Sequence, residues 1–166
     1  MSEPAAPLLH HPVPMGQLLV CPVPAILTVH GLGSCVAIFL YTARHRIGGM
    51  AHTLLPGGSR SERERTPGKF VPSALEAMLR KFEDLGVEPA GLVAKITGGA
   101  SMFAGAARER QPIGDRNVRA AVRALEEMEI PLVASDVGGT LGRTVRASTG
   151  DGTLEIRTLR QSPRSI

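Results

Sequence analysis

Residues 31–41, GLGSCVAIFLY, decide the fold around which the rest of the chain is arranged. A glycine-containing turn passes directly into the run 35–41, which is almost entirely apolar. Such a run is typical of a strand that is buried on both faces. A return strand is predicted for 47–55 and contains GGMAH at 48–52. Two adjacent antiparallel strands would therefore bring Cys35 and His52 to the same end of a hairpin.

A thiol and an imidazole at one end of a hairpin form a candidate nucleophile and base. Cys35 and His52 are 52 − 35 = 17 residues apart, and the glycines before the cysteine leave the backbone around it open. A neighbouring imidazolium lowers the pKa of a thiol from its free value of about 8.5, which holds a thiolate at neutral pH. A lone cysteine in an apolar run is also typical of a small core residue, and this alternative stays open. Cys21 has no such partners and is predicted to be structural.

Other residues compete for the remaining roles. His30 is a rival base, five residues before the cysteine, whereas His45 falls in a polar turn. A third residue that orients the histidine would be a hydroxyl, an amide or a carboxylate, and Thr28, Ser34 and Thr53 are the nearest candidates. The sequence pattern does not choose among them.

The order of predicted elements indicates an α+β protein. We expect a layered α/β/β sheet or sandwich with two main helices packed outside, at 70–85 and at 114–128, where Asp115 is the expected N-cap. The segment 57–69 is predicted to be a surface loop. The further strands are expected at 17–21, 25–29, 92–97, 131–136, 143–147 and 153–158.

The length of 166 residues favours one domain that buries an ordinary hydrophobic core. We expect a proline-rich flexible leader at 1–16, a single catalytic domain at 17–158 and a frayed polar tail at 159–166. The default expectation is a monomer.

Composition excludes several classes of function. Aromatic residues make up only 3% of the chain and the net charge of +4 is dispersed, so a nucleic-acid surface is not expected. Two cysteines without a Cys-x-x-Cys pair predict neither a disulfide framework nor a zinc site, and favour the cytoplasm. No apolar run approaches the roughly 18 residues of a membrane helix, so membrane insertion is not expected. No glycine cluster has the spacing of a nucleotide-binding loop.

The chain resembles the CheD family of bacterial chemoreceptor glutamine deamidases over roughly residues 17–158. Six blocks carry the resemblance, in the order and approximate spacing of the family. They are GLGSCVAI at 31–38, GGMAHTLLP at 48–56, KFVPSALEAML at 69–79, LVAKITGGASMF at 92–103, IGDRNVRAAVRAL at 113–125 and VASDVGGTLGR at 133–143.

The resemblance implies a hydrolase that converts glutamine side chains of chemoreceptor cytoplasmic domains to glutamate, without a metal or an organic cofactor. It implies that Cys35 is the nucleophile and His52 its partner, and that the fold resembles that of the bacterial toxin deamidases. The third catalytic residue of the family is a threonine six positions before the cysteine. In this chain that position is Val29, and Thr28 is adjacent.

Cysteine chemistry on an amide proceeds through a thioester, with oxyanion support expected from backbone N–H groups around Gly33 and Ser34. The same acyl-enzyme would serve hydrolysis of a receptor methyl ester. A different class of function is a binding module that docks to a CheC-type phosphatase or acts as a receptor adaptor. A redox-sensing thiol is a third hypothesis.

Overall fold

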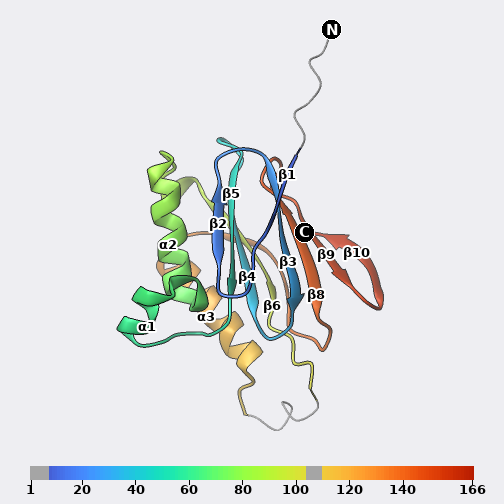
Figure 1. Cartoon of the computed structure of the whole chain (residues 1–166). Helices are drawn as coiled ribbons and strands as arrows, with labels where there is room; N and C mark the ends of the chain where they lie inside the picture. The colour runs from blue at the N-terminus through green and yellow to red at the C-terminus, as the bar shows by residue number, and fades with distance from the viewer. Residues whose placement is uncertain (1–7, 104–109) are drawn as a thin grey trace.

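A computed structural model describes residues 8–103 and 110–166 and shows three layers (Figure 1). Two main helices cover one face of a five-stranded central sheet, and a second five-stranded sheet, the outer sheet, covers the other face. The α+β class and the α/β/β layering are therefore as predicted. In this described part of the chain, no helix is both long and apolar enough to cross a membrane.

The central sheet holds the predicted hairpin at its middle. β4 is its central strand and is buried along its whole length, as the apolar run predicts. In spatial order the sheet consists of β2 (Leu18–Cys21), β5 (Ile47–Thr53), β4 (Val36–Thr42), β6 (Val93–Gly98) and β7 (Leu132–Val137).

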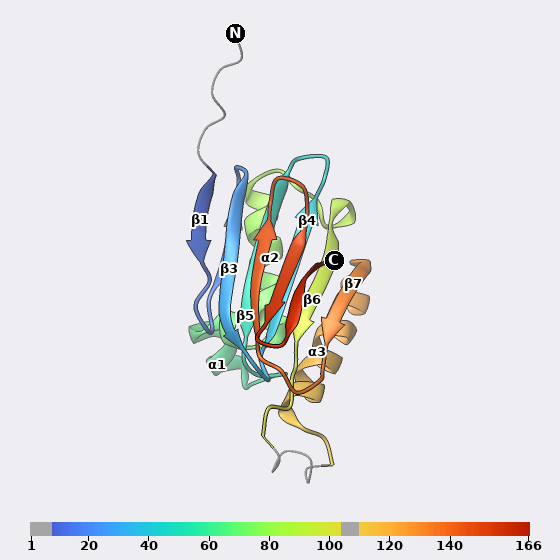
Figure 2. The ribbon, with the colours of Figure 1, turned by 90° about the vertical axis from the view of Figure 1, so that its right-hand side faces the viewer.

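The outer sheet faces the viewer in Figure 2, with the helices behind it. In spatial order it consists of β1 (Leu9–Pro12), β3 (Ala25–Leu32), β8 (Arg143–Ser148), β9 (Leu154–Thr158) and β10 (Gln161–Ser165). β1 runs parallel to β3, and β10 pairs antiparallel with β9. The flexible leader predicted for 1–16 is therefore wrong for residues 9–12, and the frayed tail is wrong for residues 161–165, because backbone pairing orders both segments.

Within residues 8–103 and 110–166, five helical segments join the strands. The two main helices, α2 (Val71–Asp84) and α3 (Ile113–Glu127), lie close to their predicted bounds. Pro112 precedes α3 as its N-cap, so the prediction of Asp115 at that position is wrong, and its carboxylate lies in the first turn instead. A short helix α1 (Arg60–Arg65) and two 3-10 turns, η1 (Pro67–Lys69) and η2 (Pro89–Gly91), complete the set.

The helix α1 corrects the prediction of a surface loop at 57–69, because residues 60–65 are on the surface but helical. Ser59 caps it, because its hydroxyl accepts from the Glu62 backbone N–H while the Glu62 carboxylate accepts from the Ser59 backbone N–H. This reciprocal capping box stabilises a charged segment that has no apolar face. The absence of apolar periodicity is therefore what hid the helix in the sequence.

Two apolar cores separate the layers. The first lies between the central sheet and the helices and includes Ile38, Leu75 and Phe82. The second lies between the two sheets and includes Phe39 and Met50. Alternate residues of β4 therefore point to different cores, which fixes the face on which each neighbouring side chain lies.

Candidate active site

Cys35 occupies the turn that leads from the outer sheet into β4, at the lower end of the molecule in Figure 1. Its carbonyl accepts a hydrogen bond from the Gly99 N–H at 2.8 Å. A Cβ atom at Gly98, where φ is +114°, would lie 2.2 Å from that carbonyl oxygen, so only glycine fits there. Of the two free cysteines in the described residues, Cys21 is buried and Cys35 is partly exposed. Cys35 is thus the thiol that a substrate can reach.

A buried asparagine holds the strand ends around this turn. Asn117 lies in the first half of α3 and is fully buried. Its Nδ2 donates to the carbonyl of Ser34 and to the carbonyl of Leu54, each at 2.9 Å. One side chain thereby connects α3 to the residue before Cys35 and to the residue after β5.

The register of the hairpin places the thiol and the imidazole on one face of the central sheet. His52 pairs directly with Ala37, and Cys35 lies two residues before Ala37. Residues two apart on a strand share a face, so Cys35 and His52 are diagonal neighbours, a relation typically of about 7–8 Å between Cα atoms. This face points toward the outer sheet, as the neighbouring Phe39 and Met50 in the inter-sheet core confirm.

His52 is almost completely enclosed, with 2% of its surface exposed. Its backbone N–H donates to the Gln17 carbonyl at 3.0 Å, and its own carbonyl accepts from the Gly16 N–H at 2.8 Å. The ring nitrogen Nδ1 lies 3.3 Å from the carbonyl oxygen of Val13. The residues that follow β1, 13–17, therefore pass over the histidine and hold both its backbone and its ring.

The Val13 contact determines the tautomer of His52. A carbonyl oxygen only accepts, so this hydrogen bond requires the proton to be on Nδ1. In the neutral ring Nε2 then carries the lone pair. Nε2 is buried and has no hydrogen-bond partner among the described residues. It is therefore available as a base on the face that Cys35 shares.

Burial favours the uncharged form of both side chains. It raises the pKa of the Cys35 thiol, which a backbone hydrogen bond at the same residue partly opposes. It lowers the pKa of the His52 imidazole, which the Val13 carbonyl partly opposes. The sequence predicts a thiolate beside an imidazolium. The surroundings in the structure favour a neutral thiol beside a neutral imidazole instead.

The structure does not bring Thr28 to the pair. Val29 is fully buried in the core between the sheets, and Thr28 lies on the opposite, half-buried face of β3. The irregularity in the pairing of β3 with β8 falls between Val29 and Leu32, after Thr28, so no bulge turns Thr28 inward.

The other predicted candidates also lie apart from the His52 ring. Thr53 points to the helix-side face, where its hydroxyl donates to the Val36 carbonyl at 2.9 Å. His30 is exposed near the end of β3, and His45 lies beyond the far end of β4. Ser34 stays beside Cys35 in the turn.

Two hollows flank the turn of Cys35, one on each side of Met102. The smaller, of about 270 Å³, is lined by Ser34 and by Phe103, and its lining is mostly apolar. The larger, of about 520 Å³, is lined by His30 and by Leu159. The side chain of Met102 lines both hollows and leaves no room for a Cβ atom at Gly33, which would lie 2.8 Å from its sulfur.

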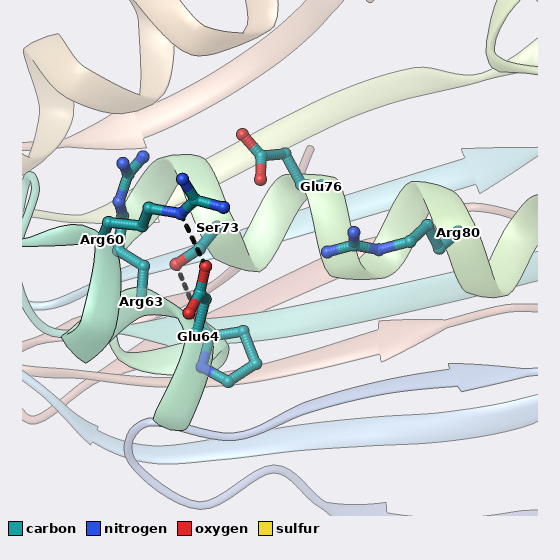
Figure 3. Close-up of a pocket in the computed structure, with 7 residues that line it drawn as sticks. Arg60, Arg63, Glu64, Ser73, Glu76 and Arg80 are labelled. Carbon is teal, nitrogen blue, oxygen red and sulfur yellow. Dashed lines mark hydrogen bonds and ion pairs between the residues drawn. The ribbon is translucent and has the colours of Figure 1, made fainter.

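A further hollow lies between α1 and α2, where side chains of opposite charge face one another (Figure 3). Arg60 and Glu64 form an ion pair at 2.8 Å, and the Ser73 hydroxyl donates to the Pro67 carbonyl at 2.7 Å. Its lining contains no thiol and no imidazole. The Ser73 hydroxyl therefore has no imidazole base beside it in this lining, and the hollow lacks a nucleophile–base pair for acyl transfer.

Comparison with known proteins gives the family of this chain. The family model described as "CheD chemotactic sensory transduction" matches residues 54–158. A protein of Geobacter metallireducens named "Probable chemoreceptor glutamine deamidase CheD 2" is 47% identical over 146 residues, which covers 86% of this chain and 90% of that protein. A protein of Halalkalibacterium halodurans named "Chemoreceptor glutamine deamidase CheD" is 38% identical over 156 residues, covering 93% and 96%.

A third relative comes from the archaeon Thermococcus kodakarensis and is named "Probable chemoreceptor glutamine deamidase CheD". It is 39% identical over 145 residues, covering 87% of this chain and 90% of that protein. The resemblance drawn from the six sequence blocks is thereby confirmed. This chain belongs to the CheD family.

Proposed function

We propose that this chain is a cysteine-dependent protein-glutamine deamidase that acts on the cytoplasmic domains of chemoreceptors. The observation that carries the proposal is the shared sheet face of Cys35 and His52, on which Nε2 of the imidazole has no protein partner among the described residues. The names of the relatives support the choice of glutamine amide and of chemoreceptor as substrate. The likeness to toxin deamidases, the cytoplasmic location and the monomeric state stay predictions.

The first half of the reaction forms a thioester. His52 Nε2 takes the proton of the Cys35 thiol while the sulfur attacks the carbonyl carbon of the glutamine side chain. The carbon–nitrogen bond then breaks, and the imidazolium returns the proton to the leaving group, which departs as ammonia. The Val13 carbonyl stabilises the imidazolium because it accepts from Nδ1 throughout.

The second half releases glutamate. Water attacks the thioester carbon and gives one proton to His52 Nε2, the carbon–sulfur bond breaks, and the sulfur takes that proton back. Backbone N–H groups of the turn around Gly33 and Ser34 are the proposed donors to the oxyanion. Neither half requires a metal or an organic cofactor. A receptor methyl ester would enter through the same thioester and release methanol.

The hollows beside Met102 are the proposed binding sites for the substrate backbone. They border Ser34 on one side and His30 on the other, so a peptide that lies across them passes over the turn of Cys35. Their apolar lining, with Phe103 79% exposed, suits apolar side chains of a bound peptide.

Ammonia release from a purified receptor cytoplasmic fragment tests the proposal. The parent protein is expected to release ammonia with a gain of about one dalton per converted glutamine in the fragment, as amide becomes acid. Cys35→Ala is expected to abolish release, and the matched control Cys21→Ala, which alters the buried thiol, is expected to retain it. Equal release by Cys35→Ala and the parent protein would refute the assignment.

A second candidate function is a non-catalytic regulator that binds a CheC-type phosphatase or a receptor. The observation that favours it is Val29, which puts an apolar side chain where the family carries its third catalytic residue. A pull-down with phosphatase and receptor, combined with the mass measurement, separates the two functions. Binding without any mass change in the receptor would favour the regulator.

A further inference from the structure

A row of four side chains crosses the central sheet on the face that carries His52. Ala37 of β4 pairs with His52 of β5 on one side and with Thr97 of β6 on the other. Thr97 in turn pairs with Asp136 of β7. Directly paired residues share a face, so the four side chains point toward the outer sheet in the order His52, Ala37, Thr97, Asp136.

Thr97 has a buried hydroxyl without a partner. Its side chain is fully buried, and Oγ1 has no hydrogen-bond partner among the described residues. Asp136 cannot supply one readily, because Arg143 binds its Oδ1 and Arg164 binds its Oδ2. A buried hydroxyl without a partner destabilises the fold, so its presence calls for a role.

His52 and Thr97 flank one small residue. Ala37 lies between them in the pairing and has only a methyl group, so the side chains that carry the two unpartnered atoms, Nε2 and Oγ1, project on either side of that methyl group. Cys35 lies two residues before Ala37 and is a diagonal neighbour of both His52 and Thr97. The thiol, the imidazole and the hydroxyl therefore surround one point on the sheet face.

We propose that Thr97 is a further catalytic residue, whose hydroxyl binds the water that hydrolyses the thioester. Oγ1 accepts one hydrogen of the water, and His52 Nε2 accepts the other and removes it as the water oxygen bonds to the thioester carbon. The carbon–sulfur bond breaks, and the Cys35 sulfur receives the proton from His52. This inference rests on the proposed deamidase function.

The role of Thr97 differs from that of a residue that orients the histidine. The Val13 carbonyl already occupies Nδ1, so Thr97 has no part in fixing the tautomer. It acts only after ammonia has left. Loss of its hydroxyl should therefore slow release of glutamate and leave formation of the thioester unchanged.

The experiment follows the first turnover of the full-length protein with a receptor cytoplasmic fragment. Thr97→Val keeps the shape of the side chain and removes the hydroxyl. We expect one ammonia per protein at the parent rate, then turnover slowed about 10²-fold, with a thioester of protein and fragment visible by intact mass. Thr97→Ser should restore turnover to within a few-fold of the parent rate. Thr42→Val is the matched control, since Thr42 is buried at the far end of β4, and should behave as the parent protein.

Three outcomes would overturn the inference: parent-like turnover of Thr97→Val, loss of its first ammonia as well, or turnover of Thr97→Ser as slow as that of Thr97→Val. If Thr97→Val does not fold, as circular dichroism would reveal, Thr97→Ala provides the same comparison. Failure of the proposed deamidase function looks different, because the parent protein would then release no ammonia that depends on Cys35.

Discussion

The tautomer of His52 is fixed by a backbone carbonyl and not by a side chain. The Val13 carbonyl holds the proton on Nδ1, and the enclosure of the ring keeps Nε2 free and uncharged. The neighbouring Cys35 thiol is likewise held uncharged by burial. The pair therefore rests in its neutral form and separates charge only when a substrate arrives.

The neutral pair predicts a particular pH dependence. In the proposed mechanism activity requires uncharged His52, and burial lowers its pKa, so the acid limb of kcat/KM should lie below the ordinary histidine value of 6.5. Alkylation of Cys35 should accelerate only at pH above the ordinary thiol value, because burial raises that pKa. Iodoacetamide labelling of the Cys21→Ala variant from pH 5 to 10 measures the second quantity on one thiol. Fast labelling at pH 6 would instead indicate a preformed ion pair.

Val29 offers a test of the third catalytic position. Val29→Thr introduces the threonine that the family resemblance implies at this position, but the Val13 carbonyl already binds Nδ1 of His52. We expect ammonia release within about twofold of the parent rate. The free energy of unfolding should fall by about 1–3 kcal/mol, because the new hydroxyl enters an apolar core.

Chemical denaturation and the ammonia assay measure both effects of Val29→Thr. Val145→Thr is the matched control, because Val145 pairs with Val29 in the same core and is equally buried. Val145→Thr should lower the free energy of unfolding by a similar amount. A tenfold gain in activity that is specific to Val29→Thr would show that the hydroxyl, and not the carbonyl, is the preferred partner of His52.

At the scale of elements, the site is held by α3 as much as by the sheet that carries it. Asn117 donates to two carbonyls, one beside Cys35 and one just past β5, so the hairpin cannot open at that end without losing both bonds. Gly98 adds a second restraint, because its missing side chain lets β6 approach the carbonyl of Cys35.

Replacement of Asn117 should therefore reduce stability and activity together. Asn117→Ala leaves two partly buried carbonyls without their donor, which costs about 1–3 kcal/mol in the free energy of unfolding. Ammonia release should fall because the turn of Cys35 is no longer held against β5. Asn117→Asp should be at least as damaging, since a carboxylate cannot donate to either carbonyl.

Thermal unfolding and the ammonia assay on both Asn117 variants check this expectation. Glu126→Ala, on the exposed side of the same helix, is the control and should change neither quantity. Parent-like stability of Asn117→Ala would mean that water replaces the amide without loss.

Much of the architecture follows from local patterns. The apolar run of β4 and the helical periodicity of 70–85 predict their elements because burial and period act on neighbouring residues. β1 and β10 escaped prediction because most of their residues are exposed and each strand contains a proline, so neither shows the apolar pattern of a strand. α1 escaped because capping and charge stabilise it without an apolar face.

The part of the candidate site that consists of reactive side chains could be predicted from the sequence. Cys35 and His52 emerge from a strand–turn–strand spacing, together with the family resemblance. Val13 leaves no such signal, because any residue presents the same carbonyl, and only the return of the 13–17 segment over His52 reveals it. Asn117 left a weak signal, a polar residue on the apolar face of a predicted helix.

At the scale of the whole molecule, one carboxylate connects the two sheets at the edge of the site. Asp136 of the central sheet binds Arg143 and Arg164 of the outer sheet. The Arg164 hydrogen bond, opposed by burial and aided by Arg143, lowers the pKa of Asp136. Arg143 also donates to the carbonyls of Gly138 and Leu141, so the connection includes the loop between β7 and β8.

This connection predicts how stability depends on pH. The pKa of Asp136 is lower in the folded protein than in the unfolded chain. At pH values between these two pKa values, the unfolded chain therefore binds more protons than the folded protein. The stabilisation is therefore present above the unfolded value of about 3.9 and is lost as pH falls through the folded value. Asp136→Asn should lower the free energy of unfolding at pH 7 by about 1–3 kcal/mol and flatten its slope between pH 2 and 4.

Urea unfolding across that pH range measures the slope for the parent protein and for Asp136→Asn. Glu155→Gln is the control, because Glu155 forms a surface ion pair with Arg157 that is much more exposed. Equal slopes for the parent protein and Asp136→Asn would show that the carboxylate does not couple the sheets.

The enclosure of His52 has a consequence for the path of protons. The ring is 2% exposed, the 13–17 segment covers it, and its partly exposed neighbour on the sheet face is Cys35. A glutamine side chain seated on the sulfur would therefore separate the imidazole from bulk solvent. The enzyme would pass a single retained proton from sulfur to nitrogen without exchange with the medium.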